Sequence, residues 1–323
     1  MRRVAGLLII LYTIQRVHIE ASPGDRSISY QHCTQNCVFK HNCSRSFGTA
    51  DWVYGDCFWC RYDCMWETVE VFERTQGHIP QFHGKWPFIA MSLPFGFVIQ
   101  EPASVLFSVL NLITSYKMLG RFLRMYELPL RNMWIAYGCI GVITWFGSSV
   151  FHMSDCDFTE KLDYLGAFTF IVAGFYVSII FCFPNLHRPS SWKMKLGIQL
   201  VTCFLYLKHL KDMMTHFDYG YNMQACIVYS LITSAIYIYF VYRRKKTHGQ
   251  LHESHVILLR IVIWANLSAA LELLDFIPIF WIFDSHSLFH FATIPIPIWW
   301  AEFLDVTYGI DTRPYNKFPM KIA

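Results

Sequence analysis

Serine, histidine and aspartate residues occur at regular spacings where apolar segments of this 323-residue chain end or begin. Ser148 and His152 are four residues apart, and Asp163 follows eleven residues later. Near the C-terminus, His286 and His290 are also four residues apart. On a helix, residues at this spacing lie on one face, one turn above each other. Three neutral imidazoles can bind zinc with one position left open, as in catalytic zinc sites, and a nearby carboxylate can accept a proton from water.

Each of these residues also has a simpler interpretation. His152 alone would be an interfacial histidine, and a single His-x3-His pair is a weak indicator of metal binding. Asp163 alone would be an acidic residue at a helix N-terminus, which the helix dipole favours. Ser148 alone would be a small residue at a helix–helix contact. The metal hypothesis therefore depends on whether the surrounding elements bring all of them together.

The composition places the chain among membrane proteins. It is 54% hydrophobic and 15% charged, against about 25% charged residues in a soluble domain. Seven apolar segments of spanning length predict an all-α seven-transmembrane-helix bundle within residues 95–308. The fourth segment is the weakest, because Lys208 and His209 lie near its end. No run of basic and aromatic residues suggests a nucleic-acid partner. The segments are 97–118, 132–152, 162–183, 194–210, 221–242, 256–276 and 286–306.

Basic residues are concentrated in alternate loops. The loops after the first, third and fifth segments and the tail at 309–323 are rich in Lys and Arg, whereas the loops after the second and sixth are mainly acidic. Positive charge marks the cytoplasmic side of a membrane. The N-terminus is therefore predicted to be luminal and the C-terminus cytosolic. In this orientation all three histidines, Asp163 and Ser148 share the luminal end.

The first 21 residues have the pattern of a signal peptide. Arg2 and Arg3 precede an apolar run at 4–14, and small residues follow at Ala21 and Ser22. This pattern predicts cleavage near Ala21, the alternative being an uncleaved anchor.

Residues 22–94 form a predicted luminal module that is rich in cysteine. Six cysteines after a signal peptide predict disulfide bonds, although 15 pairings are possible. Cys57 and Cys60 could alternatively form a zinc or redox site. Asn42 begins an Asn-Cys-Ser sequon and is predicted to be glycosylated, whereas the sequon at Asn266 lies within an apolar segment. The six cysteines are Cys33, Cys37, Cys43, Cys57, Cys60 and Cys64.

Three acidic residues lie in the luminal parts of the first and sixth segments: Glu101, Glu272 and Asp275. They could accept hydrogen bonds from the histidines and orient them, or they could bridge helices. No Gly-x-Ser-x-Gly motif indicates an independent nucleophile.

The whole pattern resembles the CREST membrane hydrolase superfamily, and within it the post-GPI-attachment-to-proteins factor 3 family. The resemblance begins with Ser-x3-His, Asp163 and the final His-x3-His, and it covers nearly all of the chain after the signal. Gly147-Ser148-Ser149 departs from the bulkier, single-serine run expected there, so Ser149 could share the role of Ser148. The matching stretches are QFHGKWPF (81–88), QEPAS (100–104), TEKLDY (159–164), FDYGYN (217–222), and LLELLDF, DSHSLFH and TIPIP within 271–297.

The resemblance implies a phospholipase A2 that removes the sn-2 acyl chain of GPI anchors, with GPI-anchored proteins and membrane lipids as its partners. It implies the Golgi membrane, and partly that of the endoplasmic reticulum. His152, His286 and His290 would hold Zn²⁺, Asp163 would be the general base, and Ser148 would position the water or the oxyanion. Two alternatives stay open: a ceramidase-like amidase, which is not expected to carry the long cysteine-rich module, and a non-enzymatic receptor or chaperone for GPI-anchored cargo.

Overall fold

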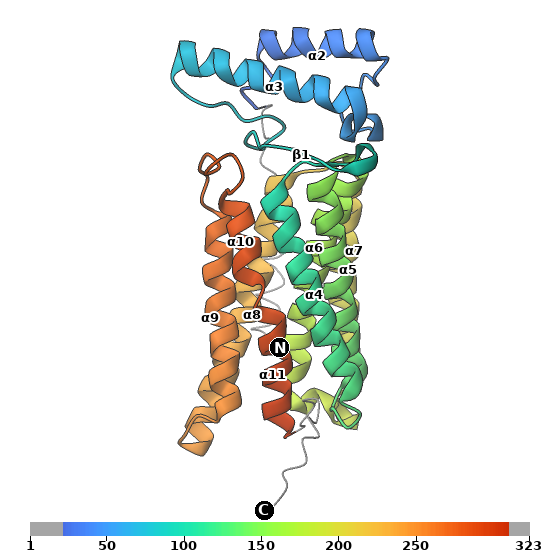
Figure 1. The fold of residues 1–323 in the computed structure, drawn as a ribbon. Coiled ribbons are helices and arrows are strands. Elements are labelled where there is room, and N and C mark those ends of the chain that lie inside the picture. The colour runs from blue at the N-terminus through green and yellow to red at the C-terminus, as the bar shows by residue number, and fades with distance from the viewer. Residues whose placement is uncertain (1–21, 310–323) are drawn as a thin grey trace, which may run out of the picture.

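The computed structural model describes residues 22–309, and the predicted signal peptide and most of the tail lie outside this range. The described chain has two parts (Figure 1). A pair of helices, α2 (Ile28–His41) and α3 (Gly55–Gln76), lies across one end of a bundle of long helices. A short 3-10 helix at Ala50–Val53 precedes α3.

Three disulfides join α2 and the segment after it to α3. They pair Cys33 with Cys64, Cys37 with Cys60 and Cys43 with Cys57. The pairs are nested because the helices run antiparallel: the first cysteine of α2 meets the last of α3. Small disulfide-linked modules of this kind have limited apolar cores, and here the core forms around the fully buried Trp52. The prediction of a disulfide-bonded module is confirmed, and Cys57 and Cys60 belong to two separate disulfides.

The bundle contains six long helices and a broken seventh element. A two-stranded antiparallel hairpin, β1 (Met91–Ser92) and β2 (Val98–Ile99), connects it to the module through a turn at Pro94–Gly96. Two 3-10 turns, Pro184–His187 and Pro189–Ser191, join α6 to α7. The helices are α4 (Pro102–Arg124), α5 (Arg131–Met153), α6 (Asp157–Cys182), α7 (Trp192–Thr215), α8 (Tyr219–His248), α9 (Glu253–Glu272), α10 (Ser285–Thr293) and α11 (Ile296–Tyr308).

Within residues 22–309, five helices are long and apolar enough to cross a membrane: α4, α5, α6, α8 and α9. The all-α membrane class is therefore supported, but seven spans are not shown. In α7, five charged residues interrupt the apolar sequence. The predicted seventh segment is two short helices, α10 and α11, which are separated at Pro295. Proline has no backbone N–H to donate to the carbonyl four residues earlier, and its ring clashes with that carbonyl, so a continuous helix is interrupted there. Lys193, Lys195, Lys208, Lys211 and Asp212 are the charged residues of α7.

Apolar and polar side chains occupy opposite ends of the bundle interior. Away from the module, Trp134, Trp300 and Phe303 pack in a buried apolar core. Towards the module, the interior contains buried serines, histidines and carboxylates instead. Burial of polar groups is costly unless they are bonded to each other, so this end of the bundle is where a functional site is expected.

Candidate metal centre

Three histidines from two helices meet at the module end of the bundle. His152 is in the last turn of α5, His286 is in the first turn of α10, and His290 is in the last turn of α10. One ring nitrogen or the other of each residue lies within 4.8 Å of those of the other two. The Nε2 atoms of His152 and His286 are 3.2 Å apart. The structure thus brings together the three histidines that were assigned to zinc from the sequence.

The Nδ1 atom of each histidine has its own partner. Glu101 Oε2 lies 2.6 Å from Nδ1 of His152, and Glu272 Oε2 lies 2.7 Å from Nδ1 of His286. Because an ionised carboxylate only accepts hydrogen bonds, both Nδ1 atoms donate. The lone pairs of these two histidines are therefore on Nε2, on the side where the rings meet. This is the usual arrangement of metal-binding histidines, whose second nitrogen donates to a carboxylate.

A hydrogen-bond chain connects the third histidine to Asp163. His290 Nδ1 lies 2.8 Å from Ser108 Oγ, and Ser108 Oγ lies 3.3 Å from Ser148 Oγ. Ser148 is in turn hydrogen-bonded to the Asp163 carboxylate. Since the chain ends at an acceptor, each hydroxyl donates towards Asp163 and His290 Nδ1 donates to Ser108. Nε2 of His290 is then also left with its lone pair.

Asp163 is buried beside the cluster, but it is not one of the three residues whose ligand atoms converge. Its carboxylate interacts electrostatically with His152 and His286. One turn of α5 before His152, Gly147 allows α6 to approach closely: a Cβ there would lie 3.1 Å from Leu162 Cγ. This close packing brings Ser148 to Asp163. Ser149 differs, since its hydroxyl donates to the Trp145 carbonyl of its own helix at 2.8 Å.

Local sequence explains why α10 begins just before the histidines. Asp284 accepts the Ser287 N–H at 2.8 Å, and Ser287 Oγ accepts the Asp284 N–H at 3.0 Å. This reciprocal capping satisfies two backbone donors at the helix start. The other end is fixed to α4, because Asn111 Nδ2 donates to the His290 carbonyl at 2.7 Å. Together these contacts set the height and rotation of α10.

Three polar residues of α4 were not predicted to belong to the site: Ser104, Ser108 and Asn111. With the N-cap residue Glu101 they recur at spacings of three and four, which place them on a single helix face, and all four are buried. Three of them contact His152 or His290, and Ser104 Oγ is buried without a hydrogen-bond partner in the described chain. Their spacing in an otherwise apolar segment was the available signal.

Lys85, from the loop of the module that follows α3, also contacts this site. Its Nζ lies 2.6 Å from Glu101 Oε1 and 2.7 Å from Asp155 Oδ2, and 4.0 Å from the Phe151 ring centroid. Although burial opposes the shift, Asp155 and Glu101 raise the pKa of Lys85 above its ordinary value. Glu101 therefore accepts from Lys85 with one oxygen and from His152 with the other.

Two other residues from the sequence analysis lie away from the histidines. Asp275 accepts hydrogen bonds from Trp86 Nε1 at 2.6 Å and from Gln81 Nε2 at 3.2 Å. It therefore connects the α9–α10 loop to residues 81–86 instead of orienting a histidine. Asn42 ends α2 in an exposed position, so its side chain is accessible for modification.

The residues present fit a zinc ion by their chemistry and spacing. Zinc–nitrogen bonds of about 2.0–2.1 Å at a tetrahedral angle place two ligand nitrogens about 3.3 Å apart. The 3.2 Å between Nε2 of His152 and of His286 agrees with this value. The exposed fraction is 1% for the His152 side chain and 30% for that of His286, so the cluster is reachable from one side.

Comparison with known proteins agrees with this geometry. The profile of the Per1-like family matches residues 48–306. This range includes all three histidines of the centre and three of the six disulfide-bonded cysteines, Cys57, Cys60 and Cys64. The chain belongs to the Per1-like family. The family resemblance seen in the sequence is thereby confirmed. No solved structure matches the fold of this chain.

Curated relatives cover most of the chain. A mouse protein named GPI-specific phospholipase A2-like PGAP3 is 32% identical over 317 residues, covering 94% of each chain. The human protein of that name is 32% identical over 298 residues, covering 88% of each. The Drosophila melanogaster protein named post-GPI attachment to proteins factor 3 is 32% identical over 326 residues, covering 94% of each. These names associate the relatives with GPI, and those of the mouse and human proteins also with a phospholipase A2-like activity.

Proposed function

We propose that this chain is a zinc-dependent hydrolase that removes the sn-2 acyl chain from the lipid of GPI-anchored proteins. The observation that supports the proposal most strongly is the arrangement of the three histidines: every Nδ1 has a partner, which leaves the three Nε2 atoms for one ion. A zinc ion bound there would supply Lewis-acid chemistry, polarising an ester carbonyl and easing the deprotonation of water.

The side chains around the histidines have separate tasks in this mechanism. Asp163 takes a proton from water, whose oxygen attacks the carbonyl carbon of the sn-2 ester. The acyl C–O bond then breaks, and the proton passes to the leaving glycerol oxygen, giving a fatty acid and a lysolipid. Ser148 donates to Asp163 and keeps its carboxylate directed at the cluster. A general base of this kind contributes about 10²–10⁴-fold to a rate.

The proposal includes an orientation in the secretory pathway. The basic loops favour a luminal module and a cytosolic tail, with α7 and the α10–α11 pair completing seven crossings. A signal peptide at 1–21 and a glycan on Asn42 fit this orientation. We place the protein in the Golgi membrane and partly in that of the endoplasmic reticulum, as the family resemblance in the sequence implies. Its substrates would then lie in the luminal leaflet, at the depth of His152.

Mass spectrometry of GPI lipids tests this function directly. Cells that lack the protein should keep the sn-2 chain on a GPI-anchored reporter, and re-expression of this chain should remove it. The His286→Ala and His290→Ala double variant should bind no zinc and leave the lipid unchanged. If the double variant holds a full equivalent of zinc, the metal assignment is wrong. If the wild-type chain leaves the anchor lipid unchanged, the hydrolase proposal is wrong and a chaperone role is favoured.

A further inference from the structure

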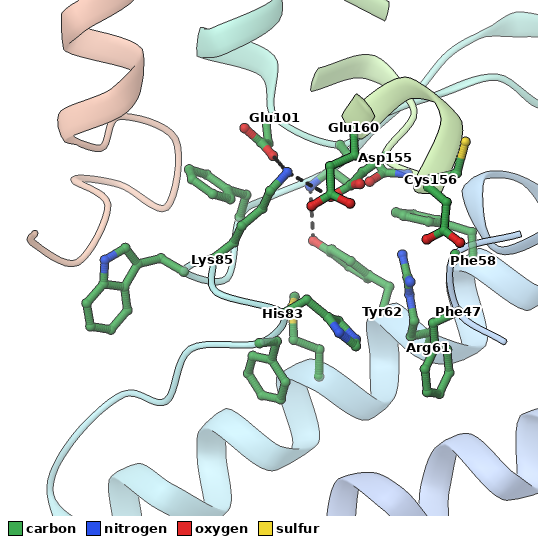
Figure 2. Close-up of a pocket in the computed structure, with 18 of the residues that line it drawn as sticks. Phe47, Phe58, Arg61, Tyr62, His83, Lys85, Glu101, Asp155, Cys156 and Glu160 are labelled. Atoms are coloured by element: carbon green, nitrogen blue, oxygen red, sulfur yellow. Dashed lines mark hydrogen bonds and ion pairs between the residues drawn. The ribbon is translucent and has the colours of Figure 1, made fainter. Parts of the chain in front are cut away.

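A polar pocket of about 250 Å³ lies between the cysteine-rich module and the bundle (Figure 2). Arg61 and Tyr62 of α3 form one wall, and Asp155 and Glu160 at the start of α6 form another. Glu101 lies at the boundary with the metal centre, because it lines the pocket and also accepts from His152. A molecule in this pocket would therefore be adjacent to a molecule reacting at the histidines.

Among residues 22–309, three polar groups of the pocket have no hydrogen-bond or salt-bridge partner. The Glu160 carboxylate interacts with Lys85 and Lys161 only through space. The Arg61 guanidinium approaches the Trp52 ring, with 5.9 Å from its carbon to the centroid. Gln100 Nε2 is buried without an acceptor. Buried polar groups are nearly always hydrogen-bonded in proteins, so the unpaired Gln100 amide indicates a ligand with an acceptor. The half-buried Arg61 and Glu160 offer a further donor and an acceptor to the same ligand.

The lining indicates which class of ligand this is. Four carboxylates face two permanent cations, Arg61 and Lys85, and Lys85 is already paired with two of the carboxylates. The negatively charged side chains outnumber the positively charged ones, so the pocket would repel a phosphate group. Hydroxyl groups, in contrast, can donate to carboxylates and accept from an arginine or an amide. Aromatic side chains, including Phe47, Phe58 and Tyr62, supply apolar faces for the ring carbons.

We propose that this pocket binds a sugar ring of the substrate's head group, and that it selects glycosylated lipids. The proposal rests on the proposed function, in which the ester lies at the histidines. The head group of a lipid in the luminal leaflet then extends away from the membrane towards α3, which lies across that end of the bundle (Figure 1) and lines the pocket with Arg61 and Tyr62. Sites for drug-sized ligands typically have volumes of about 300–1,000 Å³. The pocket, at about 250 Å³, is smaller than these sites. Its size therefore suits a single sugar ring better than a larger glycan.

A binding experiment tests the pocket without requiring catalysis. Glucosamine, inositol and inorganic phosphate are titrated separately into the purified full-length protein in detergent, and binding is followed by saturation-transfer NMR. We expect glucosamine or inositol to bind and phosphate not to bind. The Arg61→Met and Glu160→Gln double variant should weaken sugar binding at least tenfold, whereas the exposed pair of changes Arg74→Met and Glu73→Gln should not. Unchanged thermal unfolding and zinc content of both variants would show that the fold is intact.

A second measurement separates this proposal from the proposed function. The same variants are tested on a GPI lipid and on a diacyl lipid without a glycan. We expect the pocket variant to raise KM for the GPI lipid at least tenfold, with little change in kcat or in hydrolysis of the other lipid. Preferred binding of phosphate, or sugar binding that the pocket changes leave unaffected, would overturn the pocket assignment. Sugar binding by a wild-type protein that hydrolyses neither lipid would support the pocket and contradict the hydrolase.

Discussion

Asp163 and His152 are both buried at the centre of the site, but their contacts give them different tasks. His152 offers Nε2 to the cluster, whereas Asp163 is bonded to Ser148 and lies outside the set of converging ligand atoms. Removing a ligand and removing a base should therefore have different consequences. The distinction decides whether the histidine centre catalyses a reaction or only stabilises the bundle.

The Asp163→Asn variant should retain zinc and lose most of its activity. The amide keeps the size of the side chain but cannot accept a proton from water, so hydrolysis should fall by about 10²–10⁴-fold. His152→Ala should lose both metal and activity. Zinc content and the sn-2 chain of a GPI-anchored reporter are measured at equal expression. Normal remodelling of the anchor by Asp163→Asn would show that Asp163 is not the base.

Glu272→Gln should weaken metal binding without removing a ligand. Glu272 holds Nδ1 of His286, and partners of this kind are typically worth about 10–100-fold in metal affinity. Asp275→Asn is the matched control, because Asp275 lies three residues away and contacts Gln81 and Trp86 instead. Competition with a zinc chelator measures both affinities. Equal losses in the two variants would contradict a specific role for Glu272.

At the scale of elements, the histidines and their common end of the bundle were predictable from sequence. The His-x3-His spacing fixes which helix face carries both residues, and the alternating loop charge indicates which segment ends share one side of the membrane. Both can be determined from the sequence without knowledge of the packing. The break at Pro295 was not predicted, because residues 286–306 are apolar throughout and were interpreted as one segment. The proline itself was the available signal. The partners of the histidines were not predictable, because Ser108 meets His290 across 182 residues and only packing of α4 against α10 makes that contact. Disulfide pairing likewise depends on the antiparallel order of α2 and α3.

The capping of α10 should affect both stability and the metal centre. Asp284→Ala removes the acceptor for the Ser287 N–H, and loss of such a cap costs about 0.5–2 kcal/mol. His252→Ala is the control, since the His252 side chain caps α9 by accepting the Ser254 N–H at 3.2 Å, at the end of that helix opposite Glu272 and the histidines. Thermal unfolding should shift in both variants, while zinc affinity should fall only in Asp284→Ala. A similar fall in His252→Ala would indicate a general loss of stability instead.

For the whole molecule, the orientation in the membrane determines which lipids can reach the site. We expect Asn42 to carry a glycan that Asn42→Gln abolishes, and a tag added after Ala323 to be digested by protease in intact microsomes. Both results follow from an odd number of crossings with basic loops in the cytosol. The measurements are a glycosidase mobility shift and protease protection. Glycosylation of a C-terminal sequon reporter would place the tail in the lumen and overturn the orientation.

The module and the bundle are joined at the histidine centre as well as by the chain. Lys85 lies in the part of the module that follows α3, and its ammonium group bonds Glu101, which holds His152. Additional contacts, such as the 2.9 Å hydrogen bond from the Ile89 N–H to the Trp281 carbonyl, connect the same loop to the segment before α10. The module therefore contributes to the geometry of the histidines, in addition to forming a wall of the pocket.

Lys85→Met should lower both the stability of the protein and its affinity for zinc. The variant leaves Glu101 buried without its cation, and breaking a buried ion pair in this way costs about 3–5 kcal/mol. Because Glu101 also orients His152, zinc affinity should fall together with stability. Asp155→Asn is the matched comparison: it removes the other ion pair of Lys85 but leaves the 2.6 Å contact with Glu101 in place. Thermal unfolding and chelator competition on the purified full-length chain measure the two effects. If Asp155→Asn weakens zinc binding as much as Lys85→Met does, the module does not act on His152 through Glu101, and its role is confined to the pocket.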